Sequence, residues 1–230
     1  MDIVYLLKDT PKNDELTYSL RSLVNLPHDK VFFVGGCPRN IDKSKIIHIP
    51  VIQTGDKYKN TENGLKCVCK NNRLSEDFIL MNDDFFILKP IKDVFEELNL
   101  CRGSIKSVLE KIPQGTPYWS SMNQADIFLK DLGYSDPLSY ELHIPMVINK
   151  IKFLGMFLLN YIGSVSSGQQ RSLYGNMFLR GSKVVGDVKV YRDKFVPLGS
   201  DKFLSSEDIS WPRVKIYIEK LFPNKSEFEI

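Results

Sequence analysis

The sequence lacks the features that mark several common protein classes. Its 230 residues include only four cysteines, which show neither Cys-x-x-Cys pairs nor histidines at zinc-finger spacing. We interpret them as reduced thiols rather than as a zinc site or a disulfide framework. No Gly-x-x-x-x-Gly-Lys-Ser/Thr loop occurs, and no Gly-x-Gly-x-x-Gly follows the first strand-like run, which argues against a P-loop nucleotide hydrolase and a dinucleotide-binding motif.

Strong net charge and long apolar runs are also missing. The net charge of +3 is too small for a dedicated nucleic-acid-binding protein, although it suits an enzyme that meets phosphates. The most apolar stretch, residues 144–162, is interrupted by Lys150, Lys152 and Asn160, whereas a membrane-spanning helix needs about 20 nearly uninterrupted apolar residues. No basic segment precedes the first apolar run. We therefore expect a cytoplasmic protein without a transmembrane segment.

The order of apolar runs predicts an α/β fold. Short buried runs at Asp2–Leu7, Val31–Val34, Ile46–Ile52 and Phe78–Met81 are typical of strands, and helical patterns lie between them. One helix begins near Asn13 and ends before Pro27, and another is capped by Asn60 or Thr61. We expect one domain, residues 1–230, with a Rossmann-like, mostly parallel central sheet flanked by helices.

The second half of the chain is less regular in sequence. Prolines and glycines break residues 102–140 into pieces, which predicts long loops that form a substrate wall or lid. Valines on both sides of Gly186 predict a late β-hairpin over residues 184–190. Ser205 or Ser206, followed by acidic residues, is expected to cap a C-terminal helix.

The strongest functional signal is Asn82-Asp83-Asp84, which separates two apolar runs. A tight turn would explain these residues, because Asn and Asp favour turns. Ionised carboxylates are rarely buried without a partner or a metal, however, and ligands of open α/β sheets bind outside the carboxyl ends of strands. The two carboxylates therefore predict a ligand site for a divalent metal and a phosphorylated compound.

Other residues are candidates for the same site. Gly35-Gly36 ends the second strand and either allows a ligand to approach the backbone or makes a turn. Lys59, near a helix amino terminus, favours an anion site as much as a solvated helix start. Arg171 is expected to clamp a diphosphate or to lie on the surface. If residues 140–145 form a strand, Glu141 and His143 share one face, although His143 would also suit the core.

These residues resemble known enzymes of sugar transfer. The run from Phe78 to Leu88, together with Ile3-Val4-Tyr5 and Phe33-Val34-Gly35-Gly36, resembles the GT-A glycosyltransferases, in which an Asp-x-Asp-like motif ends a central strand. The block Glu76–Phe86 is also similar to the Stealth family of hexose-1-phosphate transferases. Leu6-Leu7-Lys8-Asp9 differs from the Trp-Val-Asp-Gly-like ending of that family, so we favour sugar transfer.

The resemblance implies a nucleotide-sugar donor, with a UDP-sugar expected, and Mn²⁺ or Mg²⁺ as cofactor. It covers residues 1–100 best, which would form the nucleotide-sugar-binding half, and residues 101–230 would form the acceptor side. Asp84 and Asp83 would bind the metal, Asn82 replaces the usual first aspartate, and His143 is a further candidate ligand. The general base would be Glu141, His143 or Asp126. The donor would contact Lys8, Asp9, Arg21, Gly35, Gly36, Lys59, Asn60, Asn63, Asn82, Asp83 and Arg171.

Two alternatives remain. A Stealth-like enzyme would transfer the sugar with its phosphate, and a non-catalytic domain would only bind a sugar or nucleotide. The acceptor remains open among a glycan, a protein and a modified nucleic-acid base.

Overall fold

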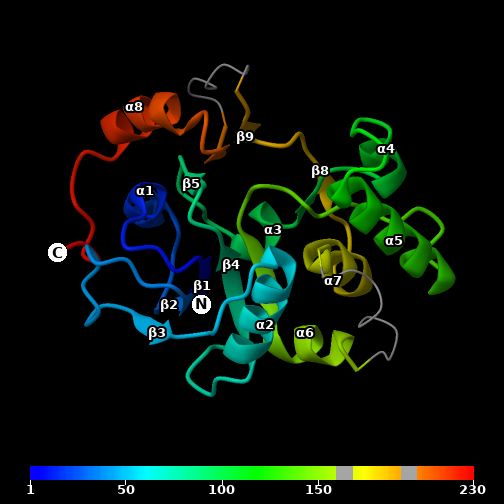
Figure 1. Cartoon of the computed structure of the whole chain (residues 1–230), viewed down its shortest axis with the longest axis horizontal. Coiled ribbons are helices and arrows are strands. Elements are labelled where there is room, and N and C mark those ends of the chain that lie inside the picture. The colour runs from blue at the N-terminus through cyan, green and yellow to red at the C-terminus, as the bar shows by residue number, and fades with distance from the viewer. Residues whose placement is uncertain (159–167, 193–200) are drawn as a thin grey trace.

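The centre of the molecule is a five-stranded sheet with strand order β3-β2-β1-β4-β7 (Figure 1). The computed structural model describes residues 1–158, 168–192 and 201–230. In it, β1 (Asp2–Leu7), β2 (Val31–Gly35), β3 (Ile47–Ile49) and β4 (Asp77–Met81) run parallel, and β7 (Met146–Asn149) pairs antiparallel with β4. The predicted mostly parallel sheet is therefore confirmed, although β3 is shorter than its apolar run.

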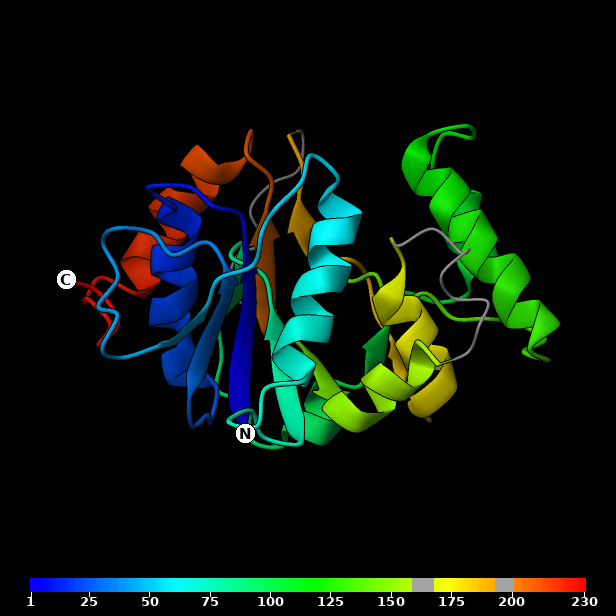
Figure 2. The same ribbon diagram turned by 60° about the horizontal axis from the view of Figure 1, so that its bottom comes forward.

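Alternate side chains of the strands face two hydrophobic cores, because successive residues of a strand point to opposite faces. On one face, Ile3 and Tyr5 pack with Leu16 and Leu20 of α1 (Asp14–Ser22). On the other face, Val4 belongs to the core that contains α2 (Lys57–Cys69), α6 (Lys150–Met156) and α7 (Gln170–Phe178). Figure 2 shows these two layers of helices on opposite sides of the sheet.

A second, three-stranded sheet begins directly after the turn that follows β4. It has the order β5-β10-β9, where β5 (Phe85–Ile87) is antiparallel to β10 (Phe203–Ser206), and β10 is parallel to β9 (Lys189–Val190). Helix α8 (Trp211–Leu221) covers this sheet and lies beside α1, where Tyr18, Phe86 and Val214 share a small core (Figure 1).

Several predicted elements of the second half are wrong. The expected hairpin does not form, because β8 (Lys183–Val184) pairs in parallel with β6 (Leu100–Cys101) and β9 pairs with β10. Residues 102–140 contain α4 (Ile105–Leu109) and α5 (Pro117–Asp131), since Ser104 and Thr116 cap helices whose first turns tolerate Pro117. The remaining short elements are α3 (Val94–Glu97) and a 3₁₀ turn at Leu23–Asn25.

Two predicted helix caps are also wrong. Ser205 and Ser206 belong to β10, and α8 begins only after Ser210. The cap of α2 is Asp56, whose carboxylate accepts hydrogen bonds from the backbone N–H groups of Tyr58 and Lys59. Sequence patterns locate such boundaries poorly, because several polar residues in a row are each able to cap a helix.

None of the helices within the described ranges is long and apolar enough to cross a membrane. The apolar stretch from residue 144 instead divides into β7 and α6. Residues 159–162 of that stretch lie outside the described part of the chain.

Candidate active site

The acidic residues occupy a tight turn between β4 and β5. The backbone N–H of Phe85 donates to the carbonyl oxygen of Asn82 at 3.3 Å, which places Asp83 and Asp84 at the tip of the turn. The turn is held in place by Phe85, which is 1% exposed and begins the second sheet. The turn chemistry expected of Asn-Asp and the expected position at the carboxyl end of a central strand therefore both occur.

Asp83 is partly buried beside the start of α1. Asn13 Nδ2 donates to Asp83 Oδ2 at 2.5 Å, and Asn13 Oδ1 accepts the backbone N–H of Leu16 as the cap of α1. Burial raises the pKa of Asp83, and the charge of Asp84 raises it further against the opposing effect of the Asn13 hydrogen bond. The folded protein therefore holds this carboxyl in surroundings that favour its protonation or a nearby cation.

Asp84 is bound by two residues of the second sheet. Its Oδ2 atom lies 3.2 Å from Lys189 Nζ on β9 and accepts the hydroxyl of Ser205 on β10 at 3.0 Å. Lys189 and Ser205 are partners in the register of the two strands, so their side chains reach the same carboxylate.

Glu15 adds a third carboxyl near this turn. Its Oε1 atom accepts the hydroxyl of Ser206 at 2.5 Å. Burial raises the pKa of Glu15 to about 7, and the charges of Asp84, Asp83 and Asp208 contribute to this shift. Three carboxyl groups therefore lie close together on this side of the site, and their mutual repulsion favours protonation or a bound cation.

A cleft of about 490 Å³ lies at the carboxyl ends of β1 and β2, beside the start of α2. Lys8, Gly35 and Asn60 line it, and Lys8 also lines a smaller pocket of about 250 Å³ that contains Asp83. Lys8 thus lies between the cleft and the acidic turn and lines both spaces.

The two glycines at the end of β2 allow the strand ends to approach closely. Gly35 has a φ angle of 97°, which side chains rarely adopt, and a Cβ atom on Gly36 would lie 2.3 Å from the carbonyl oxygen of Lys8. Gln53 supports the same corner, because its Nε2 donates to Leu7 O at 2.6 Å and its Oε1 accepts from Asp9 N at 3.0 Å.

Residues on α2 divide between the cleft and the solvent. Lys57, Asn60, Thr61 and Gly64 line the cleft at helical spacing. Lys59 and Asn63 are absent from its wall, because both are exposed on other faces of the helix. The side chain of Asn60 also binds the backbone of Thr54. Its Oδ1 accepts from Thr54 N and its Nδ2 donates to Thr54 O, both at 2.8 Å.

A partly buried group of charges lies behind the acidic turn. The guanidinium of Arg171 is 5.6 Å from the centre of the Phe85 ring, and its Nη2 donates to Ile144 O at 2.5 Å. Burial lowers the pKa of Arg171, whereas the charges of Glu141, Asp84 and Asp187 oppose this shift. Glu141 accepts hydrogen bonds from Ser172 N and Oγ, both at 3.1 Å, and burial raises its pKa.

His143 is held by Asp187. Its Nδ1 donates to Asp187 Oδ1 and Oδ2 at 2.9 and 3.0 Å, and its ring meets Phe85 edge to face with centres 6.3 Å apart. Burial opposes the ionisation of Asp187, but the hydrogen bond and charge of His143, with Arg102 at 3.8 Å, lower its pKa to about 2. Glu141 and His143 lie in a segment without strand structure, so the expected alternation does not apply.

Two predicted site residues lie elsewhere. Arg21 forms a two-pronged ion pair with Glu229 near the carboxyl terminus, at 2.8 and 2.7 Å. Asp126 lies on α5 and pairs with Lys130 one turn later, at 2.6 Å. Neither contact involves the acidic turn, and we leave both residues out of the site.

Sequence reasoning missed several residues that contact the acidic turn. Asn13 was detectable in principle, because a helix cap in the loop after β1 lies at the same sheet edge as the turn. Lys189 and Ser205 carry no local signal, since only the pairing of distant strands brings them to Asp84.

The turn has the ligand chemistry that Mn²⁺ and Mg²⁺ prefer, because both choose carboxylate oxygens. Within residues 1–158, 168–192 and 201–230, no group of three His, Cys, Asp or Glu side chains is arranged to hold a metal. One or two carboxylates are enough when substrate phosphates complete the coordination shell. Asp83 and Asp84 therefore fit a metal that a bound diphosphate helps to hold.

Comparison with solved structures gives the fold. No protein-family model matches the sequence, and no curated protein matches it. An active-site mutant of LgtC aligns with a TM-score of 0.53 at 13% identity, over 99% of this chain and 98% of the other. The galactosyltransferase LgtC in complex with donor and acceptor sugar analogues aligns with a TM-score of 0.52, at the same identity and coverage. Identity this low shows the fold alone: the chain is a single α/β domain with the GT-A glycosyltransferase fold.

Proposed function

We propose that the chain is a glycosyltransferase, which moves a sugar from a nucleotide-diphosphate sugar to an acceptor hydroxyl. The observation that carries this proposal is the acidic turn at the carboxyl end of β4, which lies next to a cleft large enough for a nucleotide, with Lys8 lining both. The GT-A fold and the position of ligands at the carboxyl edge of α/β sheets support it. The donor is a UDP-sugar in this proposal, bound by residues 1–100.

The residues around the cleft divide the work of donor binding. Gly35 and Gly36 let the nucleotide approach the backbone, and Asn60 shapes the wall of the cleft. Lys8 lies where the diphosphate would pass from the cleft to the acidic turn, and Arg171 adds positive charge behind that turn. A Mn²⁺ or Mg²⁺ ion held by Asp83 and Asp84 would supply Lewis-acid stabilisation of the leaving diphosphate.

The acceptor hydroxyl, of a glycan, a protein or a modified nucleic-acid base, binds on the side formed by residues 101–230. We propose His143 as the group that receives its proton. Asp187 accepts a hydrogen bond from Nδ1–H, so Nε2 is the nitrogen that would take the proton, and the His143 side chain is 28% exposed. Glu141 is enclosed by its hydrogen bonds to Ser172, so it suits proton transfer less well.

The test is a thermal-shift screen of UDP-, GDP- and other nucleotide sugars with and without Mn²⁺, followed by product analysis. We expect one nucleotide to stabilise the protein and transfer to release a nucleoside diphosphate. Release of the monophosphate would instead identify a Stealth-like sugar-phosphate transfer. Binding without consumption of the donor under any divalent ion would identify a non-catalytic domain, and no stabilisation at all would contradict the proposal.

Asp84→Asn tests the acidic turn. We expect it to lower the transfer rate at least 100-fold, on the order of the loss of one electrostatic contact to a transition state. Asp126→Asn is the matched control, because it removes a carboxylate that pairs with Lys130 away from the turn. Equal activity of the two variants would show that the acidic turn takes no part in the reaction.

A further inference from the structure

Lys189 makes an ion pair that differs from the other lysine pairs nearby. Its Nζ is 3.2 Å from Asp84 Oδ2, and the two side chains are 18% and 15% exposed. The pair between Lys183 and Glu96 is 63% and 66% exposed. A mostly desolvated pair interacts more strongly than an exposed one, because water screens it less.

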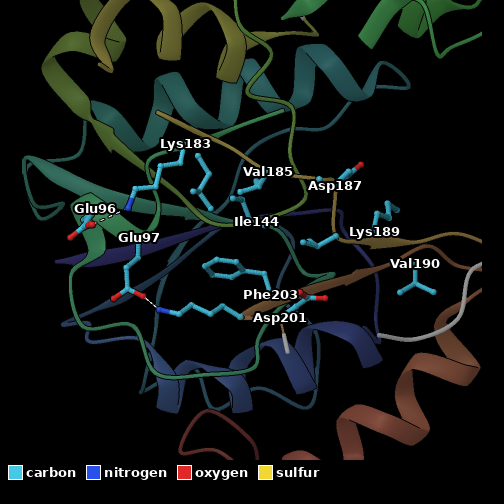
Figure 3. Close-up of a pocket in the computed structure, with 14 residues that line it drawn as sticks. Glu96, Glu97, Ile144, Lys183, Val185, Asp187, Lys189, Val190, Asp201 and Phe203 are labelled. Carbon is cyan, nitrogen blue, oxygen red and sulfur yellow. Dashed lines mark hydrogen bonds and ion pairs between the residues drawn. The ribbon is translucent and has the colours of Figure 1, made fainter. Parts of the chain in front are cut away.

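Lys189 lies between a pocket and the acidic turn. It lines a pocket of about 500 Å³, whose wall also includes Ile144, Asp187 and Phe203 (Figure 3). Figure 3 shows Lys183 away from Lys189 in this pocket, where it points to Glu96 of α3. Lys202 pairs with Glu97 of the same helix. Lys189 instead reaches out of the pocket to the acidic turn.

This contact occupies the carboxylate that the proposed metal needs. Asp84 Oδ2 is already bound by Lys189 and Ser205, and Asp83 Oδ2 is bound by Asn13. A lysine ammonium is a compact charge on a flexible four-carbon stem, so it is able to leave one anion for another close by. A diphosphate beside the turn offers a stronger negative charge than a single carboxylate.

We propose that Lys189 is a tethered cation, which holds Asp84 until the diphosphate of a bound nucleotide draws its ammonium away and frees the carboxylate for the metal. The inference rests on the proposed function. It predicts that metal and nucleotide bind with positive coupling, and that the coupling depends on Lys189. Because coupling is reciprocal, each ligand must raise the affinity for the other by the same factor.

The experiment measures Mn²⁺ affinity by electron paramagnetic resonance, with and without UDP, for the full chain and for Lys189→Met. In the unmodified protein we expect UDP to strengthen Mn²⁺ binding at least tenfold, within the usual range of coupling between sites. In Lys189→Met we expect Mn²⁺ alone to bind at least tenfold more tightly than in the unmodified protein, and the effect of UDP to shrink. Lys183→Met is the matched control and should behave like the unmodified protein.

Circular dichroism verifies the fold of each variant. If Lys189→Met does not fold, Lys189→Gln replaces it, since the amide still donates to Asp84 while the charge is lost. Equal Mn²⁺ affinity of the lysine variant and the unmodified protein without UDP would overturn the inference. Calorimetry with UDP in EDTA separates the two claims: failure of UDP to bind there, and of any nucleotide to stabilise the protein, contradicts the proposed function, whereas UDP binding with unchanged Mn²⁺ affinity contradicts only the role of Lys189.

Discussion

Individual carboxyl groups around the acidic turn lower the stability of the folded protein when they are ionised. Asp83 and Glu15 both have raised pKa values, in each case chiefly because burial disfavours the charged form. Residues held in unfavourable surroundings are common at functional sites, where ligand binding recovers the lost stability. The turn is therefore a place where substitutions are expected to stabilise the protein and impair ligand binding.

Glu15→Gln gives a pH-dependent test of this trade-off. The folded pKa of about 7 lies above the ordinary value of 4.5, so the folded state binds more protons and its stability falls as pH rises between those values. We expect Glu15→Gln to raise the free energy of unfolding by about 1 to 2 kcal/mol at pH 8, discounted for the partial exposure of the side chain. The gain should vanish near pH 4.

Urea denaturation at pH 4, 6 and 8 measures this difference. Glu62→Gln is a suitable control, because Glu62 forms an ion pair with Lys66 along α2, away from the acidic turn. A constant difference between the Glu15 variant and the unmodified protein at all three pH values would contradict the assigned titration.

The ends of β1 and β2 form one corner of the cleft, and their close approach depends on glycine. A Cβ atom on Gly36 would meet three backbone atoms, Lys8 O at 2.3 Å, Asp9 Cα at 2.7 Å and Lys8 C at 2.8 Å. Backbone atoms that directly follow a strand move less easily than a flexible side chain. The two segments would therefore have to separate.

Gly36→Ala should therefore lower the free energy of unfolding by about 1 to 3 kcal/mol, as overpacking does, and weaken nucleotide binding. Gly55→Ala is the matched control on the same cleft, because a Cβ atom there has nothing within 4 Å. Thermal melting and UDP calorimetry measure both effects. Equal melting temperatures of the two variants would show that the corner is not tightly packed.

Helix α1, near the start of the sequence, contacts the segment that follows α8 near its end. Arg21 pairs with Glu229 and also donates to Phe222 O at 3.1 Å, so the residues after α8 are docked against α1. The Arg21 and Glu229 side chains are 12% and 6% exposed. Breaking such a pair leaves a buried charge without its partner.

Arg21→Ala should lower the free energy of unfolding by about 3 kcal/mol and leave the affinity for UDP within twofold. Arg73→Ala, at an exposed position, is the control for loss of an arginine and should have little effect on either quantity. A large loss of UDP affinity in the folded Arg21 variant would return Arg21 to the nucleotide site, where the sequence placed it.

The α/β class, the parallel strands and the acidic turn were predictable from the sequence, because they depend on local properties. Apolar runs of strand length report burial on both faces, and Asn82-Asp83-Asp84 makes its own turn wherever β4 ends. The hairpin and the irregular 102–140 segment were wrong, since short strands choose partners by packing and capped helices tolerate prolines in their first turn. Only the tertiary structure brings Asn13, Lys189 and Ser205 to the acidic pair, because their contacts join segments separated by 70 to 121 residues in the sequence. The contacts of Lys189 and Ser205 follow from sheet register, which is set by the packing of the whole chain and leaves no local pattern.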